Sequence, residues 1–85
     1  MEFRPLVCVE LSPDRFVARF RLLGTGEPVF GYLPHVPGVN PYLLREGDQL
    51  FGAVLKRHGR LEVTCIRGQG LSAHGGPPYP PERIL

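Results

Sequence analysis

Glycine and proline limit this chain more than any other residues do: the sequence holds 11 glycines and 10 prolines among 85 residues. That is roughly twice their average usage. Because proline lacks a backbone donor and glycine costs backbone entropy, several long helices are excluded. The density is typical of short strands joined by tight turns. A chain of this length forms one domain with a small core.

Composition and charge exclude several other classes. Hydrophobic residues make up 42% and charged residues 21%, which is a globular composition. No apolar run approaches the ~20 residues of a membrane span, and the N-terminus lacks a signal-peptide pattern. We therefore expect a soluble cytoplasmic protein without a membrane partner. The net charge is only +2, but nine of the ten cations are arginines.

Period-two alternation predicts five short strands, at residues 6–12, 15–23, 29–33, 49–57 and 61–67. Between the third and fourth strands Pro37, Gly38 and Pro41 exclude a long helix, although one helical turn over 41–45 with Asn40 as its cap fits. Closure hides the edges of so small a sheet, so we expect an all-β, five-stranded antiparallel barrel over residues 1–67. Residues 68–85 form a Pro/Gly-rich tail.

The second predicted strand has the clearest alternation in the chain. One face carries its apolar side chains, which are Phe16, Ala18, Phe20 and Leu22, and the opposite face carries Arg15, Arg19 and Arg21. In the first strand the same rule points Val7, Val9 and Leu11 inward. In the last strand it points Leu61, Val63 and Cys65 inward.

The register of the hairpin after this strand decides where two aromatic rings lie. If Thr25 and Gly26 alone form the loop, Arg21 faces Phe30 and Arg19 faces Tyr32, which builds an exposed arginine–aromatic surface. If the loop is one residue longer, both rings turn into the core, because a slip of one residue exchanges the faces.

Cysteine and histidine spacing predicts neither a metal site nor catalysis. Cys8 and Cys65 belong to no CxxC pair and are expected as buried hydrophobes, with a disulfide between the first and last strands as the alternative. His35, His58 and His74 lie in loops at no metal-ligand spacing. We expect no cofactor and no enzymatic activity.

Residues 6–67 resemble the OB-type RNA-binding domain of the ribosomal protein S-one family and of bacterial initiation factor one. The motifs are Phe30-Gly31-Tyr32-Leu33-Pro34-His35, then Arg45-Glu46-Gly47-Asp48 leading into the fourth strand, then the hairpin Gly59-Arg60-Leu61-Glu62-Val63-Thr64. His35 falls four residues after Gly31, where the family has three. The resemblance implies an OB-like barrel that presents Phe16 and Tyr32 as stacking aromatics and strand-five arginines to phosphate.

Two functions follow as hypotheses. The first is a binding module for RNA or single-stranded DNA, because cations track a nucleic-acid backbone and rings stack on bases. Its candidate residues are Arg15, Arg19, Arg21, Phe30, Tyr32, Lys56, Arg57, Arg60 and Arg67. The second is a self-associating interaction barrel, a homodimer, because the chain has more apolar side chains than a small core needs. Those side chains are Phe3, Phe30, Tyr32, Tyr42 and Ile66, with Ile84 and Leu85 in the tail.

Overall fold

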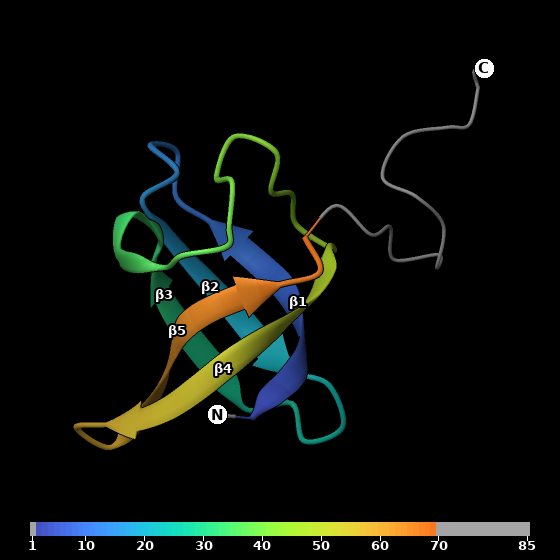
Figure 1. Ribbon diagram of the computed structural model, residues 1–85, viewed down its shortest axis with the longest axis vertical. Helices are drawn as coiled ribbons and strands as arrows, with labels where there is room; N and C mark the ends of the chain where they lie inside the picture. Colours follow the sequence, from blue (N-terminus) through green and yellow to red (C-terminus); the bar gives the residue numbers. More distant parts are fainter. Residues whose placement is uncertain (1, 70–85) are drawn as a thin grey trace.

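The computed structural model describes residues 2–69, and the expected tail beyond Gln69 lies outside the described residues (Figure 1). Its elements are β1 (Phe3–Leu11), β2 (Val17–Leu22), β3 (Pro28–Tyr32), the 3₁₀ helix η1 (Leu33–His35), β4 (Gln49–Arg57) and β5 (Arg60–Arg67). All five predicted strands are present, and β4 has the predicted bounds. In the described part of the chain, no helix is long and apolar enough to span a membrane.

The strands close into a barrel in the order β1-β2-β3-β5-β4, with β4 returning to β1. The protein is therefore an all-β, OB-like barrel, as predicted. One detail of the prediction is wrong: β3 and β5 run parallel, whereas the other neighbouring strands are antiparallel. The parallel pair follows from the long connection between β3 and β4, which lets β4 cross to the β1 side before β5 returns.

The core is filled by alternate residues of each strand, and β2 follows its predicted alternation. Ala18, Phe20 and Leu22 are buried, and the residues between them are exposed. Phe16 is the exception, because it precedes the strand and is half exposed.

In β1 and β5, β-bulges change which residues face the core. Leu6 and Cys8 are buried in place of the expected Val7 and Val9, and a bulge between Cys8 and Glu10 then brings Leu11 onto the same face as these two residues. In the β4–β5 pair, Ala53 lies opposite Cys65 and Val54 opposite Val63, so β5 holds the extra residue; Val63 and Ile66 on either side of it are buried, whereas Cys65 is only half-buried. An extra residue in one strand shifts every later side chain to the other face. Ile66 is thus part of the core and not surplus surface, and the two cysteines form no disulfide.

The middle of β4 is apolar on both faces, as the sequence indicates, but only one face is covered. Leu50 is buried, while Phe51 and Leu55 are exposed. A side chain at Gly52 would collide with Leu6 and Val63, which explains the glycine where β1 and β5 approach β4.

The connection between β3 and β4 holds no helical turn at 41–45; the helical residues are those of η1. Asn40 therefore caps no helix; its side-chain oxygen accepts the Tyr42 N–H at 3.0 Å and closes an Asx turn. The loop is fixed to β5, since Ile66 N–H donates to the Pro37 carbonyl at 2.9 Å. Gly38, at φ +90°, lies so close to the Ile66 carbonyl that no side chain fits there.

Candidate nucleic-acid interface

The outer face of β2 and β3 brings the predicted arginine and aromatic side chains together. Arg19 pairs with Phe30, Arg21 with Pro28, and Val17 with Tyr32. The predicted partners are therefore wrong by two residues, because the loop runs from Leu23 to Glu27 and is not limited to Thr25 and Gly26. A shift of two residues preserves the faces, so Phe30 and Tyr32 point outward with the arginines, as the two-residue loop predicted.

Phe16, Tyr32 and His35 form an aromatic cluster at one end of this face. The Phe16 and Tyr32 rings meet edge to face at 6.4 Å, and the Tyr32 and His35 rings do so at 4.9 Å. Backbone pairing sets this arrangement, because Leu33 N–H donates to the Phe16 carbonyl at 2.7 Å. Phe16 is 51% and Tyr32 48% exposed, so the cluster offers ring surface to a ligand.

Arg15 does not lie on the strand face with Arg19 and Arg21, as the alternation predicted. It precedes β2 in a left-handed conformation, at φ 64°. Its guanidinium donates to the Pro41 and Leu44 carbonyls at 2.7 and 2.8 Å. Two carbonyl oxygens on one guanidinium nitrogen fix the 40–45 turn, so Arg15 supports a loop.

Arg19 and Arg21 do point outward from β2, but each has a partner. Arg19 forms an ion pair with Glu10 of β1 at 2.7 Å, and Arg21 donates to the Gly26 carbonyl at 2.9 Å. Both arginines are exposed, so a phosphate can replace their present partners at a small cost in free energy. The three predicted cations thus form no continuous stripe.

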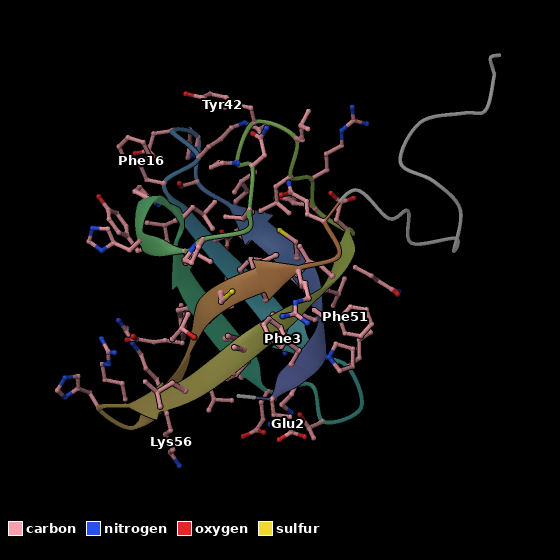
Figure 2. The ribbon with its side chains drawn as sticks, in the orientation of Figure 1. Glu2, Phe3, Phe16, Tyr42, Phe51 and Lys56 are labelled. Atoms are coloured by element: carbon pink, nitrogen blue, oxygen red, sulfur yellow. The ribbon has the colours of Figure 1, made fainter. Side chains whose placement is uncertain are left out.

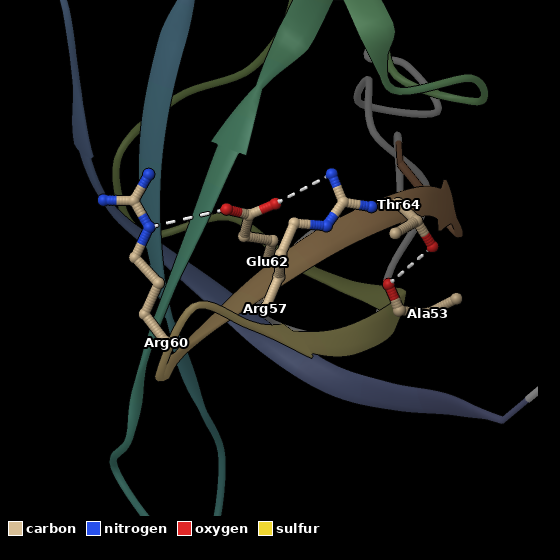
Figure 3. Close-up of polar contacts among 5 residues, drawn as sticks. All are labelled: Ala53, Arg57, Arg60, Glu62 and Thr64. Carbon is tan, nitrogen blue, oxygen red and sulfur yellow. Dashed lines mark hydrogen bonds and ion pairs between the residues drawn. The ribbon is translucent and has the colours of Figure 1, made fainter.

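At the opposite end of the barrel lies the basic hairpin of residues 56–60, in which Lys56 belongs to the last part of β4 before the turn (Figure 2). His58 and Gly59 both have positive φ, which gives the tight turn predicted from their sequence. Glu62 binds both neighbouring guanidiniums, Arg60 at 3.4 Å and Arg57 at 3.7 Å (Figure 3). These contacts are long and solvated, so they contribute little to stability.

Phe30 connects the hairpin to the strand face. The Arg60 guanidinium carbon lies 5.1 Å from the centre of the Phe30 ring, which is a cation–π contact. Phe30 also lies in register with Glu62 of β5 and opposite Arg19 of β2. Its ring is therefore flanked by two cations, Arg19 and Arg60, which can contact phosphates beside a stacked base, and by the anion Glu62.

Arg67 belongs to a different surface. Its guanidinium lies 4.1 Å from the centre of the Phe3 ring, and the residue is paired with Phe51 of β4. Both rings lie on the β1–β4 side of the barrel (Figure 2). The nine predicted residues are thus divided among four places: the β2–β3 face with Arg19, Arg21, Phe30 and Tyr32, the β4–β5 hairpin with Lys56, Arg57 and Arg60, the loop contact of Arg15, and the β1–β4 side with Arg67.

Burial and hydrogen bonding alter the pKa values of Cys8 and Asp14. Burial raises the pKa of the Cys8 thiol from 9.0 to about 11, so Cys8 is a protonated core residue at neutral pH. The Ser12 hydroxyl and the Phe16 N–H donate to Asp14 and hold its pKa below the ordinary value. Because the folded pKa is lowered, this contribution to stability is complete above the unfolded pKa and is lost as pH falls through the folded pKa.

Sequence reasoning left three exposed groups out of the site: His35, Tyr42 and Leu43. His35 closes the aromatic cluster, and Tyr42 and Leu43 extend from the loop that Arg15 holds. The signal for the last two is the sequence Asn40-Pro41-Tyr42-Leu43, a turn-forming pair followed by large apolar residues. Across residues 2–69, no three His, Cys, Asp or Glu side chains gather as a metal site requires.

No protein-family model matches this chain, and none of the curated proteins matches it as a relative. The resemblance to the S-one family consequently rests on the motif residues alone, and the geometry of the β2–β3 face is the basis for assigning a function.

Proposed function

We propose that this protein is a non-catalytic module that binds single-stranded nucleic acid, RNA or DNA, across the outer face of β2 and β3. The observation that carries the proposal is the exposed aromatic cluster of Phe16, Tyr32 and His35 in line with Phe30 and Arg60. OB-type barrels bind oligonucleotides on this face, between the β1–β2 loop and the β4–β5 loop. Phe16 follows the first of these loops, and the basic hairpin is the second.

Stacking supplies most of the proposed affinity. Each base stacked on an aromatic ring is worth about 1–3 kcal/mol, whatever its identity. The rings of Phe16 and Tyr32 are held by the backbone pairing of Val17 with Tyr32 and by the Phe16–Leu33 hydrogen bond, so little order has to be gained on binding.

Electrostatic attraction is the smaller part of the proposal. Arg19 is bound to Glu10, and Glu62 faces Arg57 and Arg60, so phosphates must compete with carboxylates for most of these cations. For single strands, log K falls with log salt by about 0.7 for each phosphate contact. We therefore expect a shallow salt dependence, with a slope of about −1 to −2.

The test is fluorescence anisotropy with labelled oligouridylate, oligothymidylate and a duplex of the same length. We expect both single strands to bind and the duplex to bind less well, because its bases are already stacked. Tyr32→Ala should weaken binding about fivefold or more. The matched control is Phe51→Ala, because Phe51 is a similarly exposed ring on the other side of the barrel. Absent binding at low salt, or equal losses for both variants, would contradict the proposal.

Self-association is the second candidate, and exposed apolar residues of β4 favour it. Phe51 and Leu55 are each nearly half exposed, outside the β2–β3 face. A second copy of this barrel would cover them, forming a homodimer. Light scattering should then give the mass of two chains, and Phe51→Glu should return it to one. A single-chain mass at high concentration contradicts this candidate.

A further inference from the structure

The 40–45 turn displays two large apolar side chains to solvent. Tyr42 is 83% exposed and Leu43 67% exposed, whereas the next residue, Leu44, is completely buried. Leu44 therefore anchors the turn in the core, while the two residues before it contribute no burial of their own. Exposed apolar groups on a rigidly supported loop are typical of ligand-binding loops on a fixed scaffold.

Several hydrogen bonds restrain this short turn, including four that involve the side chains of Arg15, Asn40 and Asp48. Arg15 donates to the Pro41 and Leu44 carbonyls, on either side of the exposed pair. Asn40 accepts the Tyr42 N–H, and Asp48 accepts the Arg45 N–H at 2.9 Å. Arg15 adopts its left-handed conformation to make these contacts, which is a strained backbone for a residue with a side chain.

The same arginine sets the turn against the aromatic cluster. Arg15 and Phe16 are consecutive, so the guanidinium that holds the turn leaves the chain directly beside a ring of the cluster. Phe16 and Tyr42 accordingly lie at the same end of the barrel, opposite Lys56 (Figure 2). The exposed rings of Phe16 and Tyr42 thus share one end of the barrel, and Arg15 links the segments that carry them.

We infer that Tyr42 is a further stacking site for an unpaired base of the same strand, and that Arg15 is its positioning residue. This inference rests on the proposed function, and it assigns the ligand a path that runs beyond the β2–β3 face onto the β3–β4 loop. Stacking is favoured over a protein contact because Tyr42 is an exposed ring at the same end of the barrel as Phe16, a ring of the cluster. A ligand that spans both regions must be longer than one that covers the cluster alone.

Oligothymidylates of two lengths test the inference, about four and about twelve nucleotides, both within the range of site sizes of single OB folds. Tyr42→Ala should weaken binding of the long strand about fivefold or more and leave the short strand, held by the cluster, within about twofold. Tyr42→Phe should restore the long-strand affinity, because it keeps the ring. Because the side chain is exposed, neither variant should change stability, which urea unfolding checks.

Arg15→Met tests the positioning role. It should weaken the long strand and spare the short one, and combining it with Tyr42→Ala should add little further loss, because both changes remove the same stacking interaction. If the long strand binds Tyr42→Ala as tightly as the unaltered protein while Tyr32→Ala weakens it, this inference is wrong and the proposed function stands. If neither strand binds the unaltered protein, both are wrong.

Discussion

At one end of the β2–β3 face an arginine is bound to backbone carbonyls, and at the other end two arginines share a carboxylate in solvent. Arg15 reaches Pro41 and Leu44, 26 and 29 positions away, and joins two loops. Arg57 and Arg60 reach Glu62, only a few positions away, on the same hairpin. The first arrangement stabilises the fold, whereas the second leaves charge available to a ligand.

The comparison teaches that the chemistry of the partner, and not residue type, decides what each arginine does. Carbonyl oxygens on a core-anchored turn need a donor, since an unpaired polar group in a buried place is costly. The Glu62 carboxylate instead holds two guanidiniums that are each more than half exposed, so water or a ligand reaches both cations. The turn beside the aromatic cluster is consequently held in place, whereas the arginines of the basic hairpin can exchange their carboxylate partner for a ligand.

The largest expected effect concerns the backbone that supports the aromatic end. Gly38→Ala should destabilise the protein by about 3 kcal/mol or more, because a side chain there adds a collision with Ile66 to the strain of a positive φ. Gly59→Ala in the basic hairpin is the matched control: its φ is +79° but nothing lies near, so about 1 kcal/mol is expected. Urea unfolding measures both, and equal losses would remove the distinction between the two ends.

A smaller effect separates the arginines themselves. Arg15→Met should cost about 2 kcal/mol, because two carbonyl oxygens lose a charged donor. Arg60→Met should cost less than about 1 kcal/mol, since its contacts with Glu62 and Phe30 are exposed. Thermal and urea unfolding measure the change in the free energy of unfolding for each variant. A larger loss of stability for Arg60→Met than for Arg15→Met would contradict the structural role assigned to Arg15.

The fate of Arg15 also shows how far the sequence predicts this protein. The five strands and the barrel follow from local alternation, which needs no knowledge of distant contacts, whereas the direction of Phe30 and Tyr32 depends on the hairpin register, for which the sequence allows two alternatives. Arg15 continues that alternation, so the pattern places it on β2. Its carbonyl partners are remote in sequence, and only the folded chain reveals them.

β-Bulges account for most of the other differences between the core residues predicted from the sequence and those in the structure. Alternation assumes one residue per step, and β1 inserts an extra residue between Cys8 and Glu10. Alternation therefore groups Leu11 with Val9 and Val7, whereas in the barrel Leu11 packs on the same core as Leu6 and Cys8. In the hairpin, loop length fixed the cross-strand partners, so Arg19 faces Phe30 instead of Tyr32 although the face is correct.

The third prediction concerns the charge that each end presents to a ligand. Replacing both Arg57 and Arg60 with alanine should make the salt dependence of single-strand binding shallower by about 0.7 for each phosphate that is no longer bound. Arg15→Met should leave the slope unchanged, because its guanidinium is occupied by carbonyl groups. Anisotropy titrations over a series of salt concentrations measure the slopes. A change in the slope of the salt dependence for Arg15→Met would show that Arg15 contacts phosphate in the complex.

The smallest effect is expected for Glu62→Gln, which removes the anion of the basic hairpin and keeps its shape. Stability should change by less than about 0.5 kcal/mol, because both ion pairs are long and solvated. Single-strand affinity at low salt should rise about two- to threefold, since Arg57 and Arg60 no longer have a competing carboxylate, and the gain should vanish at high salt. Glu10→Gln, which releases only Arg19, is the control and should give a smaller rise. A loss of affinity in Glu62→Gln would mean that Glu62 orients Arg60 over Phe30, and the hairpin would then be a structured site like the aromatic end.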